Sequence, residues 1–74
     1  MRAPPGIKVK EAIDVIEKDG WFMIRSRGSH RQFRHKFKKG LVTIAGHLSD
    51  DLARGTFNSI VKQAGLKYGR KESV

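Results

Sequence analysis

The chain has 74 residues, so it is expected to form one domain with a modest apolar core. Its 16 Lys and Arg residues outnumber seven Asp and Glu residues, which gives a formal net charge of +9. It contains no cysteine, which excludes disulfide bonds and a thiol nucleophile and fits a reducing cytoplasm. Its longest apolar run, the four residues from Trp21 to Ile24, is too short to span a membrane. We therefore expect a soluble cytoplasmic protein that binds a polyanion: a nucleic acid first, an acidic protein second and an anionic membrane third. Binding to a membrane is disfavoured, because no predicted helix combines a basic face with bulky aromatic residues as an interfacial anchor does.

The first element in the chain is predicted to be an amphipathic helix. It follows residues 1–6, a proline-containing segment that we expect to be a flexible lead-in. Apolar residues then recur at the spacing of one helical face, at Val9, Ala12, Ile13 and Ile16. Gly20 should end this helix. No Ser, Thr, Asp or Asn lies just ahead of Val9, so the start of this helix should lack a side-chain cap.

Two strands should follow the helix. Trp21–Arg25 is aromatic and follows a glycine, which predicts a mostly buried strand. Arg27–Ser29 should form the turn that leads into a second strand, His30–Phe37. Alternation along this second strand points Phe33 and Phe37 to the core, and His30, Gln32 and Arg34 to the opposite face.

A third strand and a second helix complete the predicted fold. Phe37–Gly40 should form a hairpin turn, and Leu41–Ile44 should be a strand with Val42 and Ile44 inward. After a surface loop at 46–52, a helical stripe recurs at Phe57, Ile60, Val61 and Ala64. Thr56 is the expected N-cap and Gly65 the expected stop of this helix.

The predicted element order is αβββα, an α+β fold. We expect a three-stranded antiparallel sheet that packs two helices on one face and leaves the other face open to water. The domain should span residues 7–66, followed by a frayed basic tail at 67–74.

The open face, which should carry Arg25, His30, Gln32 and Arg34, should bind RNA together with its turns. Every Lys, Arg, Asp or Glu from Arg25 to Lys39 is a Lys or an Arg, and such charges repel one another unless a polyanion relieves them. Each charge taken singly is more often a solvated surface group, but their clustering favours binding to a phosphate backbone. The expected RNA-binding residues are Arg25, Arg27, Gly28, Ser29, Arg31, Gln32, Arg34, Lys36, Lys38, Lys39 and His47.

The three histidines carry different expectations. His35 shares a face with Phe33, which favours a partly buried structural role, whereas for His47 structural and phosphate-contacting roles stay open. His30 lies at the start of a strand on the cationic face. RNA hydrolysis without a metal needs a base for the 2′-hydroxyl proton, an acid for the leaving 5′ oxygen and cations near phosphorus. An imidazole among guanidiniums can supply these groups, although an idle, solvated His30 also stays open.

Other chemistries fit the sequence poorly. The histidines are five and twelve residues apart, and no carboxylate lies near His30 or His35, so we expect no metal site. Ser29 is adjacent to His30 in sequence, where its hydroxyl could not easily reach that ring as a nucleophile. A glycine-rich phosphate loop is also missing from the sequence. We expect no cofactor.

Four segments occur in the same order as in the HicA toxins, the YcfA-like mRNA interferases, and resemble them: Glu17–Trp21, Arg27–His35, Gly40–Ile44 and Gly55–Leu66. Gly28-Ser29-His30, followed by Phe33 and His35, is among the most specific parts. The resemblance implies a fold like that of double-stranded-RNA-binding domains and cleavage of mRNA that blocks translation. It also implies a catalytic role for His30 and a cognate acidic HicB-type antitoxin that covers the site.

The residues and the resemblance together predict the toxin of a type II toxin–antitoxin system. It would be a metal-independent endoribonuclease with His30 as general acid or base, monomeric when free and in a larger complex with its antitoxin. One alternative is a non-catalytic double-stranded-RNA-binding module, but such modules use several lysines at the start of the second helix, where this chain has one cation, Arg54. An adaptor for an acidic protein would cleave no RNA and show no steep salt dependence of RNA affinity.

Overall fold

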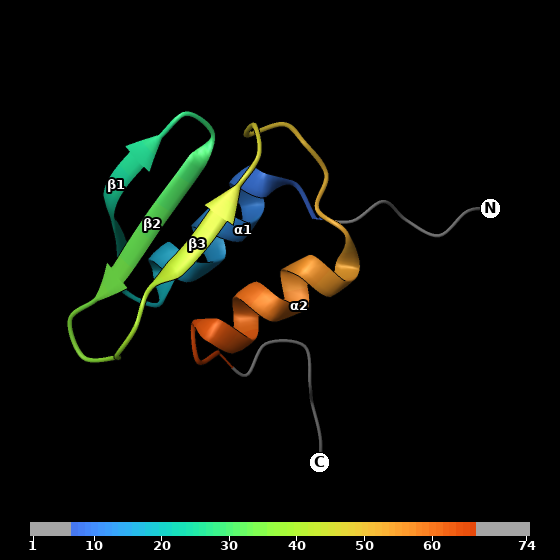
Figure 1. The fold of residues 1–74 in the computed structure, drawn as a ribbon. Coiled ribbons are helices and arrows are strands. Elements are labelled where there is room, and N and C mark those ends of the chain that lie inside the picture. Colours follow the sequence, from blue (N-terminus) through green and yellow to red (C-terminus); the bar gives the residue numbers. More distant parts are fainter. Residues whose placement is uncertain (1–6, 67–74) are drawn as a thin grey trace, which may run out of the picture.

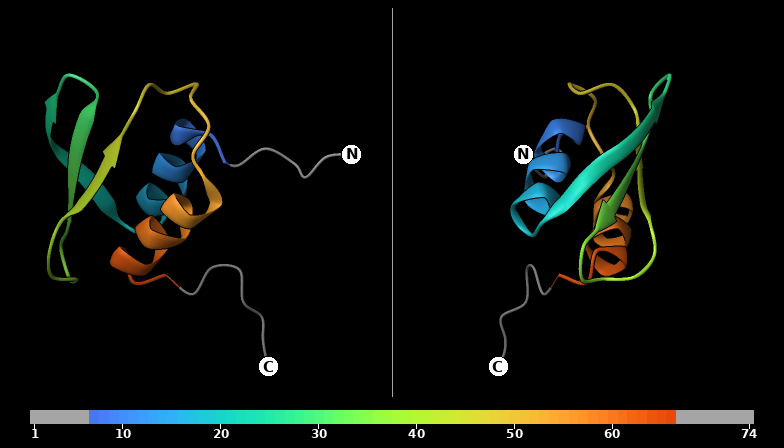
Figure 2. Two further views of the ribbon diagram at one scale, coloured as in Figure 1. Left: turned by 45° about the vertical axis from the view of Figure 1, so that its right-hand side comes forward. Right: turned by 90° about the vertical axis from the view of Figure 1, so that its left-hand side faces the viewer.

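The computed structural model describes residues 7–66 of the chain. Its elements in chain order are α1 (Val9–Lys18), β1 (Trp21–Arg27), β2 (His30–His35), β3 (Val42–Ala45) and α2 (Arg54–Gln63). The strands form one antiparallel sheet in the order β1-β2-β3, and both helices lie on the same face of it (Figures 1 and 2). The predicted αβββα fold is confirmed. The predicted lead-in at 1–6 and the predicted tail at 67–74 lie outside the described residues.

The core fills the space between the two helices and the inner face of the sheet. Phe33 of β2 and Val42 and Ile44 of β3 are at most 1% exposed, which confirms the face predicted for each of them. The helices contribute the apolar stripes that their periodicity predicts: Val9, Ala12 and Ile16 from α1, and Phe57, Ile60, Val61 and Ala64 from the end of α2. Within residues 7–66, neither helix is long and apolar enough to cross a membrane.

The start of α1 is held by the loop at 46–52. The Lys8 side chain at the N-cap makes no cap hydrogen bond, as predicted, but the Glu11 carboxylate accepts from the Lys8 backbone N–H at 3.0 Å. In addition, the backbone N–H of Val9 donates to the Asp50 carbonyl at 2.9 Å, and that of Lys10 donates to the Leu48 carbonyl at 3.1 Å. These loop carbonyls satisfy N–H groups that have no partner inside the helix. The contact therefore ties the segment after β3 to the helix layer.

The prediction that the first strand is mostly buried is wrong. Of the residues of β1, Trp21 is buried, whereas Phe22, Met23 and Ile24 are 49%, 50% and 47% exposed. Phe22 is opposed to Arg34 and therefore points to the open face. Met23 and Ile24 stay uncovered because β1 is an edge strand and the β1–β2 hairpin leans away from the helix layer (Figure 2). An aromatic-rich segment has therefore been placed where the helices do not cover it.

Two local predictions are also wrong. Phe37 is 85% exposed, because β2 ends at His35 and the alternation that would point Phe37 inward ends with it. Thr56 is not the N-cap of α2, since the helix begins at Arg54 with Ala53 as its N-cap. The predicted helix stops are confirmed, because the C-cap residues of α1 and α2 directly precede Gly20 and Gly65.

Phe33 and Phe37 provide a matched pair for testing this core. Phe33→Ala should lower the free energy of unfolding by about 3–5 kcal/mol, because it leaves a cavity under the helices. Phe37→Ala should change it by no more than about 0.5 kcal/mol, because that ring is exposed. Urea unfolding followed by tryptophan fluorescence measures both values, and similar losses for the two variants would contradict the placement of Phe33.

Candidate nucleic-acid interface

A β-bulge in the β1–β2 hairpin decides which side chains share the open face of the sheet. Met23 pairs with Phe33, but the next pair along the strands is Arg25 with Gln32, so Ile24 has no opposed residue of its own. Side chains alternate between the two faces of a strand. One extra residue therefore turns every following side chain of β1 to the opposite face.

The bulge brings two arginines to the face that carries His30. Directly opposed residues of an antiparallel pair point to the same face. Arg25 is opposed to Gln32, and Arg27 is opposed to His30. Regular alternation from the buried Trp21 would instead point Arg25 and Arg27 towards the helices. Arg25 lies on the open face, as predicted. The sequence contains no residue that marks the bulge, so alternation alone does not explain this placement.

His30 is exposed at the first position of β2. Within residues 7–66, its ring has no hydrogen-bond or ion-pair partner. It directly follows the two-residue turn Gly28-Ser29, where Gly28 has the positive φ of 59° that tight hairpin turns require. On its other side, His30 is opposed to Ala45 of β3, a small residue. The imidazole is therefore accessible to a ligand from solvent.

The predicted RNA-binding residues do not form one cluster but three groups. The first lies with His30 in the half of the sheet next to the Gly28-Ser29 turn, and consists of Arg25, Arg27, Gly28, Ser29, Gln32 and His47. The loop of His47 begins at this end, because the Gly46 N–H donates to the Ser29 carbonyl at 3.0 Å. The second group, Arg34, Lys36 and Lys39, is exposed and lies towards the far end of β2, which spans roughly 17 Å at 3.4 Å per residue.

The third group, Arg31 and Lys38, is engaged in contacts within the protein. Arg31 points to the same face of β2 as Phe33, and its Nη1 donates to the carbonyls of Gly46 at 2.8 Å and Ser29 at 3.3 Å. Both residues were predicted to bind RNA, although alternation along the second strand also places Arg31 on the same face as Phe33. Arg31 donates to backbone carbonyls of Ser29 and Gly46, and Lys38 donates to carbonyls at the end of α2 and to the Asp19 carboxylate. The sequence does not show that the fold brings these groups within reach.

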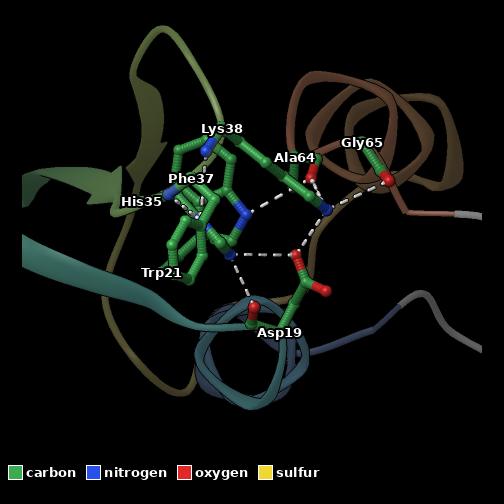
Figure 3. A network of polar contacts seen from close by, with 7 residues as sticks. All are labelled: Asp19, Trp21, His35, Phe37, Lys38, Ala64 and Gly65. Carbon is green, nitrogen blue, oxygen red and sulfur yellow. Dashed lines mark hydrogen bonds and ion pairs between the residues drawn. The ribbon is translucent and has the colours of Figure 1, made fainter.

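Lys38 closes a polar junction between the two helices and the β2–β3 loop (Figure 3). Its Nζ donates to the Asp19 carboxylate at 2.6 Å and to the carbonyls of Ala64 at 3.0 Å and Gly65 at 3.2 Å. An ammonium group has three N–H donors, so all of them are used. The charge also lies at the C-terminal ends of α1 and α2, where the helix dipoles favour a cation. The Lys38 ammonium is therefore engaged within the protein and differs in this from the exposed Lys36 and Lys39.

His35 completes this junction, which confirms its predicted structural role. Its side chain is 8% exposed, and its Nε2 lies 2.7 Å from the carbonyl oxygen of Asp19. Its Nδ1 accepts from the backbone N–H groups of Phe37 at 2.9 Å and Lys38 at 3.2 Å. A nitrogen that accepts two N–H bonds carries no proton, so the proton lies on Nε2 and is donated to Asp19. His35 is fully occupied, whereas His30 is not.

Candidate metal ligands do not gather in this structure. Among residues 7–66, no group of three or more His, Cys, Asp or Glu side chains could hold a metal ion. The histidines at the turn end, His30 and His47, lie on β2 and in the loop after β3. The Asp50 carboxylate in that loop accepts from the His47 backbone N–H at 3.0 Å, which shapes the loop itself.

The fold and the open face define a small α+β protein with a cationic sheet surface and an exposed histidine at one end. The family model described as "HicA toxin of bacterial toxin-antitoxin" matches residues 9–66, which is most of the chain. The chain therefore belongs to the HicA toxin family. A comparison with curated proteins found no match.

A solved structure described as "Toxin-Antitoxin complex from Streptococcus pneumoniae" contains a chain of similar fold. The two chains share 32% sequence identity and superpose with a TM-score of 0.64. The match covers 80% of this chain and 97% of that chain. The similarity therefore extends over the domain that carries the open face, and it agrees with the family assignment.

The junction predicts a specific acid sensitivity. The hydrogen bond from Lys38, with the charge of that ammonium, holds the pKa of Asp19 below its ordinary value. Ionised Asp19 therefore stabilises the fold above its unfolded-state pKa, about 3.9, and this contribution is lost as the pH falls through the lower folded-state pKa. Urea unfolding of the wild type and of Asp19→Asn between about pH 2 and pH 6 should show this component in the wild type alone.

Asp14→Asn is the control for that measurement, because Asp14 is an exposed carboxylate on α1. The unfolding free energy of the Asp14→Asn variant should depend on pH in much the same way as that of the wild type. If Asp19→Asn were to follow the wild-type curve over the whole range, the ion pair with Lys38 would not contribute to stability.

Proposed function

We propose that this HicA-family chain is a metal-independent endoribonuclease that cleaves mRNA and blocks translation, as the toxin of a type II toxin–antitoxin system. The observation that carries the proposal is the exposed, unengaged imidazole of His30 directly opposite Arg27 on a cationic sheet face. Family membership supports a toxin of a toxin–antitoxin system. A toxin with this target acts in the cytoplasm, and we place the chain there.

The proposed reaction uses the 2′-hydroxyl of the RNA as the internal nucleophile. His30 acts as general base for the 2′-hydroxyl proton or as general acid for the leaving 5′ oxygen. The 2′ oxygen then bonds to phosphorus as the bond from phosphorus to the 5′ oxygen breaks, which leaves a 2′,3′-cyclic phosphate. The developing negative charge at phosphorus requires a nearby cation. Arg27 can supply it, because it is directly opposed to His30 in the sheet.

The remaining side chains of the open face would hold the RNA backbone so that the scissile phosphate lies beside His30. Arg25 and Gln32 are opposed to each other beside the reacting end, and Arg34 lies further along β2. Guanidinium groups bind phosphate through two N–H donors, so these residues fix the backbone without reading its bases. The exposed Lys36 and Lys39 would extend the electrostatic contact.

The alternative of a non-catalytic double-stranded-RNA-binding module finds less support. Such a module needs several cations at the start of its second helix. The first turn of α2 begins at Arg54 and continues with Gly55, Thr56 and Phe57, so it offers one cation. A cleavage assay separates the two functions, because a binding module would leave every RNA intact.

Replacing His30 should remove catalysis and leave binding. His30→Ala is expected to lower the single-turnover cleavage rate of mRNA by about a hundred- to ten-thousandfold, the usual effect of losing a proton-transfer group. RNA affinity should change little, because most of the contact with the phosphate backbone is assigned to the arginines and lysines of the open face. The rate is measured with purified protein in excess chelator, on gels that resolve the cyclic-phosphate product.

Gln63→Ala, an exposed position near the end of α2, is the matched control and should cleave at the wild-type rate. The proposal fails if His30→Ala cleaves as fast as this control. It also fails if the wild type cleaves no RNA in chelator but does so with an added divalent cation.

We further propose that an acidic antitoxin of the HicB type covers the open face and that the free toxin is a monomer. The net charge of +9 and the arginines beside His30 complement an acidic surface. The half-exposed Phe22, Met23 and Ile24 offer apolar contact next to those charges. The similar chain from Streptococcus pneumoniae is described as part of a toxin–antitoxin complex, which supports a larger assembly with the antitoxin.

Association with the antitoxin should depend on where the charges lie, not on their total number. Arg25→Gln combined with Arg27→Gln should slow the association rate about tenfold at low salt, because both charges face the proposed partner. Lys18→Gln combined with Lys62→Gln removes the same charge from exposed helix positions and should have a much smaller effect. Stopped-flow or biolayer measurements give the rates, and equal slowing by the two pairs would contradict the proposed interface.

A further inference from the structure

The peptide that leads into His30 is held from two sides by groups that are distant in the chain. The carbonyl oxygen of Ser29 accepts the Gly46 N–H at 3.0 Å and the Arg31 Nη1 at 3.3 Å. The same Nη1 donates to the carbonyl oxygen of Gly46 at 2.8 Å. One guanidinium nitrogen thus connects the β1–β2 turn to the first residue after β3. These three hydrogen bonds form the joint between the two segments.

Gly46 is shaped for this joint. Its φ is +111°, a conformation that residues with a side chain rarely adopt. A Cβ at this position would also lie 3.2 Å from Cγ2 of Val9, at the start of α1. The absence of a side chain lets the Gly46 peptide lie close to both α1 and the turn, so that its N–H and its carbonyl can both take part in the joint.

We propose that Arg31 is a positioning residue for His30, and not a phosphate ligand. This inference rests on the proposed function, in which His30 transfers a proton at the scissile phosphodiester. His30 is exposed, so packing does not fix its ring, and the backbone before it must be fixed instead. By holding the Ser29 carbonyl against Gly46, Arg31 fixes the His30 backbone relative to the sheet.

The position of Arg31 in the sheet supports this role. Its neighbours in β2, His30 and Gln32, point to the open face, whereas Arg31 is opposed to Ile44 and points to the core face. Its side chain is half-buried. A guanidinium on that face that donates to two carbonyls is poorly placed to contact RNA on the other.

Arg31→Gln tests the proposal, with Arg34→Gln as the matched control on the open face of the same strand. Arg31→Gln should lower the single-turnover rate at saturating RNA on the order of ten- to a hundredfold, because a small misplacement of a catalytic group has effects of this size. RNA affinity and its salt dependence should stay near wild type. Arg34→Gln should weaken affinity and reduce the salt slope by about one.

The two roles give opposite outcomes. If Arg31→Gln weakened affinity and reduced the salt slope as Arg34→Gln does, Arg31 would be a phosphate ligand and the proposal would be overturned. Retained affinity with a slower rate, together with faster hydrogen exchange at the Gly46 amide and unchanged exchange at the Phe33 amide, would support it. Hydrogen exchange at the Gly46 amide does not depend on catalysis. It therefore reports on these hydrogen bonds even if His30→Ala cleaves RNA at the wild-type rate and the proposed function is wrong.

A measurement on the wild-type protein covers the case in which Arg31→Gln does not fold. A held guanidinium rotates slowly about its bonds, whereas an exposed one is averaged by rotation and exchange with water. The Nη protons of Arg31 should therefore give separate NMR signals at low temperature, and those of Arg34 should not. Averaged signals for both residues would overturn the proposal.

Discussion

The register of the β1–β2 hairpin is the constraint on which the proposed site depends. Trp21 and Phe33 must face the helices, because they supply large buried side chains to a small core. With those two fixed, regular pairing would turn Arg25 and Arg27 towards the same helices. The extra residue at Ile24 resolves this conflict: the first part of β1 serves the core and the second part serves the open face. Ile24, the extra residue, is 47% exposed at the edge of the sheet.

The two ends of the sheet have different tasks. At the far end, Lys38 and His35 satisfy carbonyls at the ends of both helices and hold the β2–β3 loop against them (Figure 3). At the turn end, Arg31 and Gly46 hold the peptide that precedes His30. At the far end the imidazole of His35 thus has hydrogen-bond partners within the protein, whereas at the turn end the imidazole of His30 has none among residues 7–66. The contrast between His35 and His30 follows from this division, because one ring has partners on both nitrogens and the other ring faces solvent.

Much of the fold follows from local patterns in the sequence. The helical stripes that include Val9 and Phe57 and the inward pair on β3 were predicted, because periodicity reports directly on which side of an element is buried. The prediction for Phe37 failed because alternation does not state where a strand ends. Burial of β1 was mispredicted because apolar composition does not tell an edge strand from a central one.

The candidate site was predicted in part. The placement of His30 on the outer face followed from Phe33, because residues three positions apart in a strand point to opposite faces, and the fold agrees. The roles of Arg31 and Lys38 could not be read from the sequence, because they depend on carbonyls at Gly46 and Ala64 that only the tertiary fold brings within reach. A run of Lys and Arg residues shows that a segment is positively charged. Which of these side chains are free to bind a ligand depends on which backbone carbonyls the fold places beside them.

The central claim is that the bulged register places Arg25 and Arg27 beside His30 on one face, and cross-strand nuclear Overhauser contacts in the free protein test it most directly. The bulged register predicts contacts between the backbone protons of Arg27 and His30 and between those of Arg25 and Gln32. A regular register that keeps Met23 opposite Phe33 would instead show Ile24 opposite Gln32 and Ser26 opposite His30. Observing that second pattern would contradict the account, because both arginines would then lie on the face that packs against the helices.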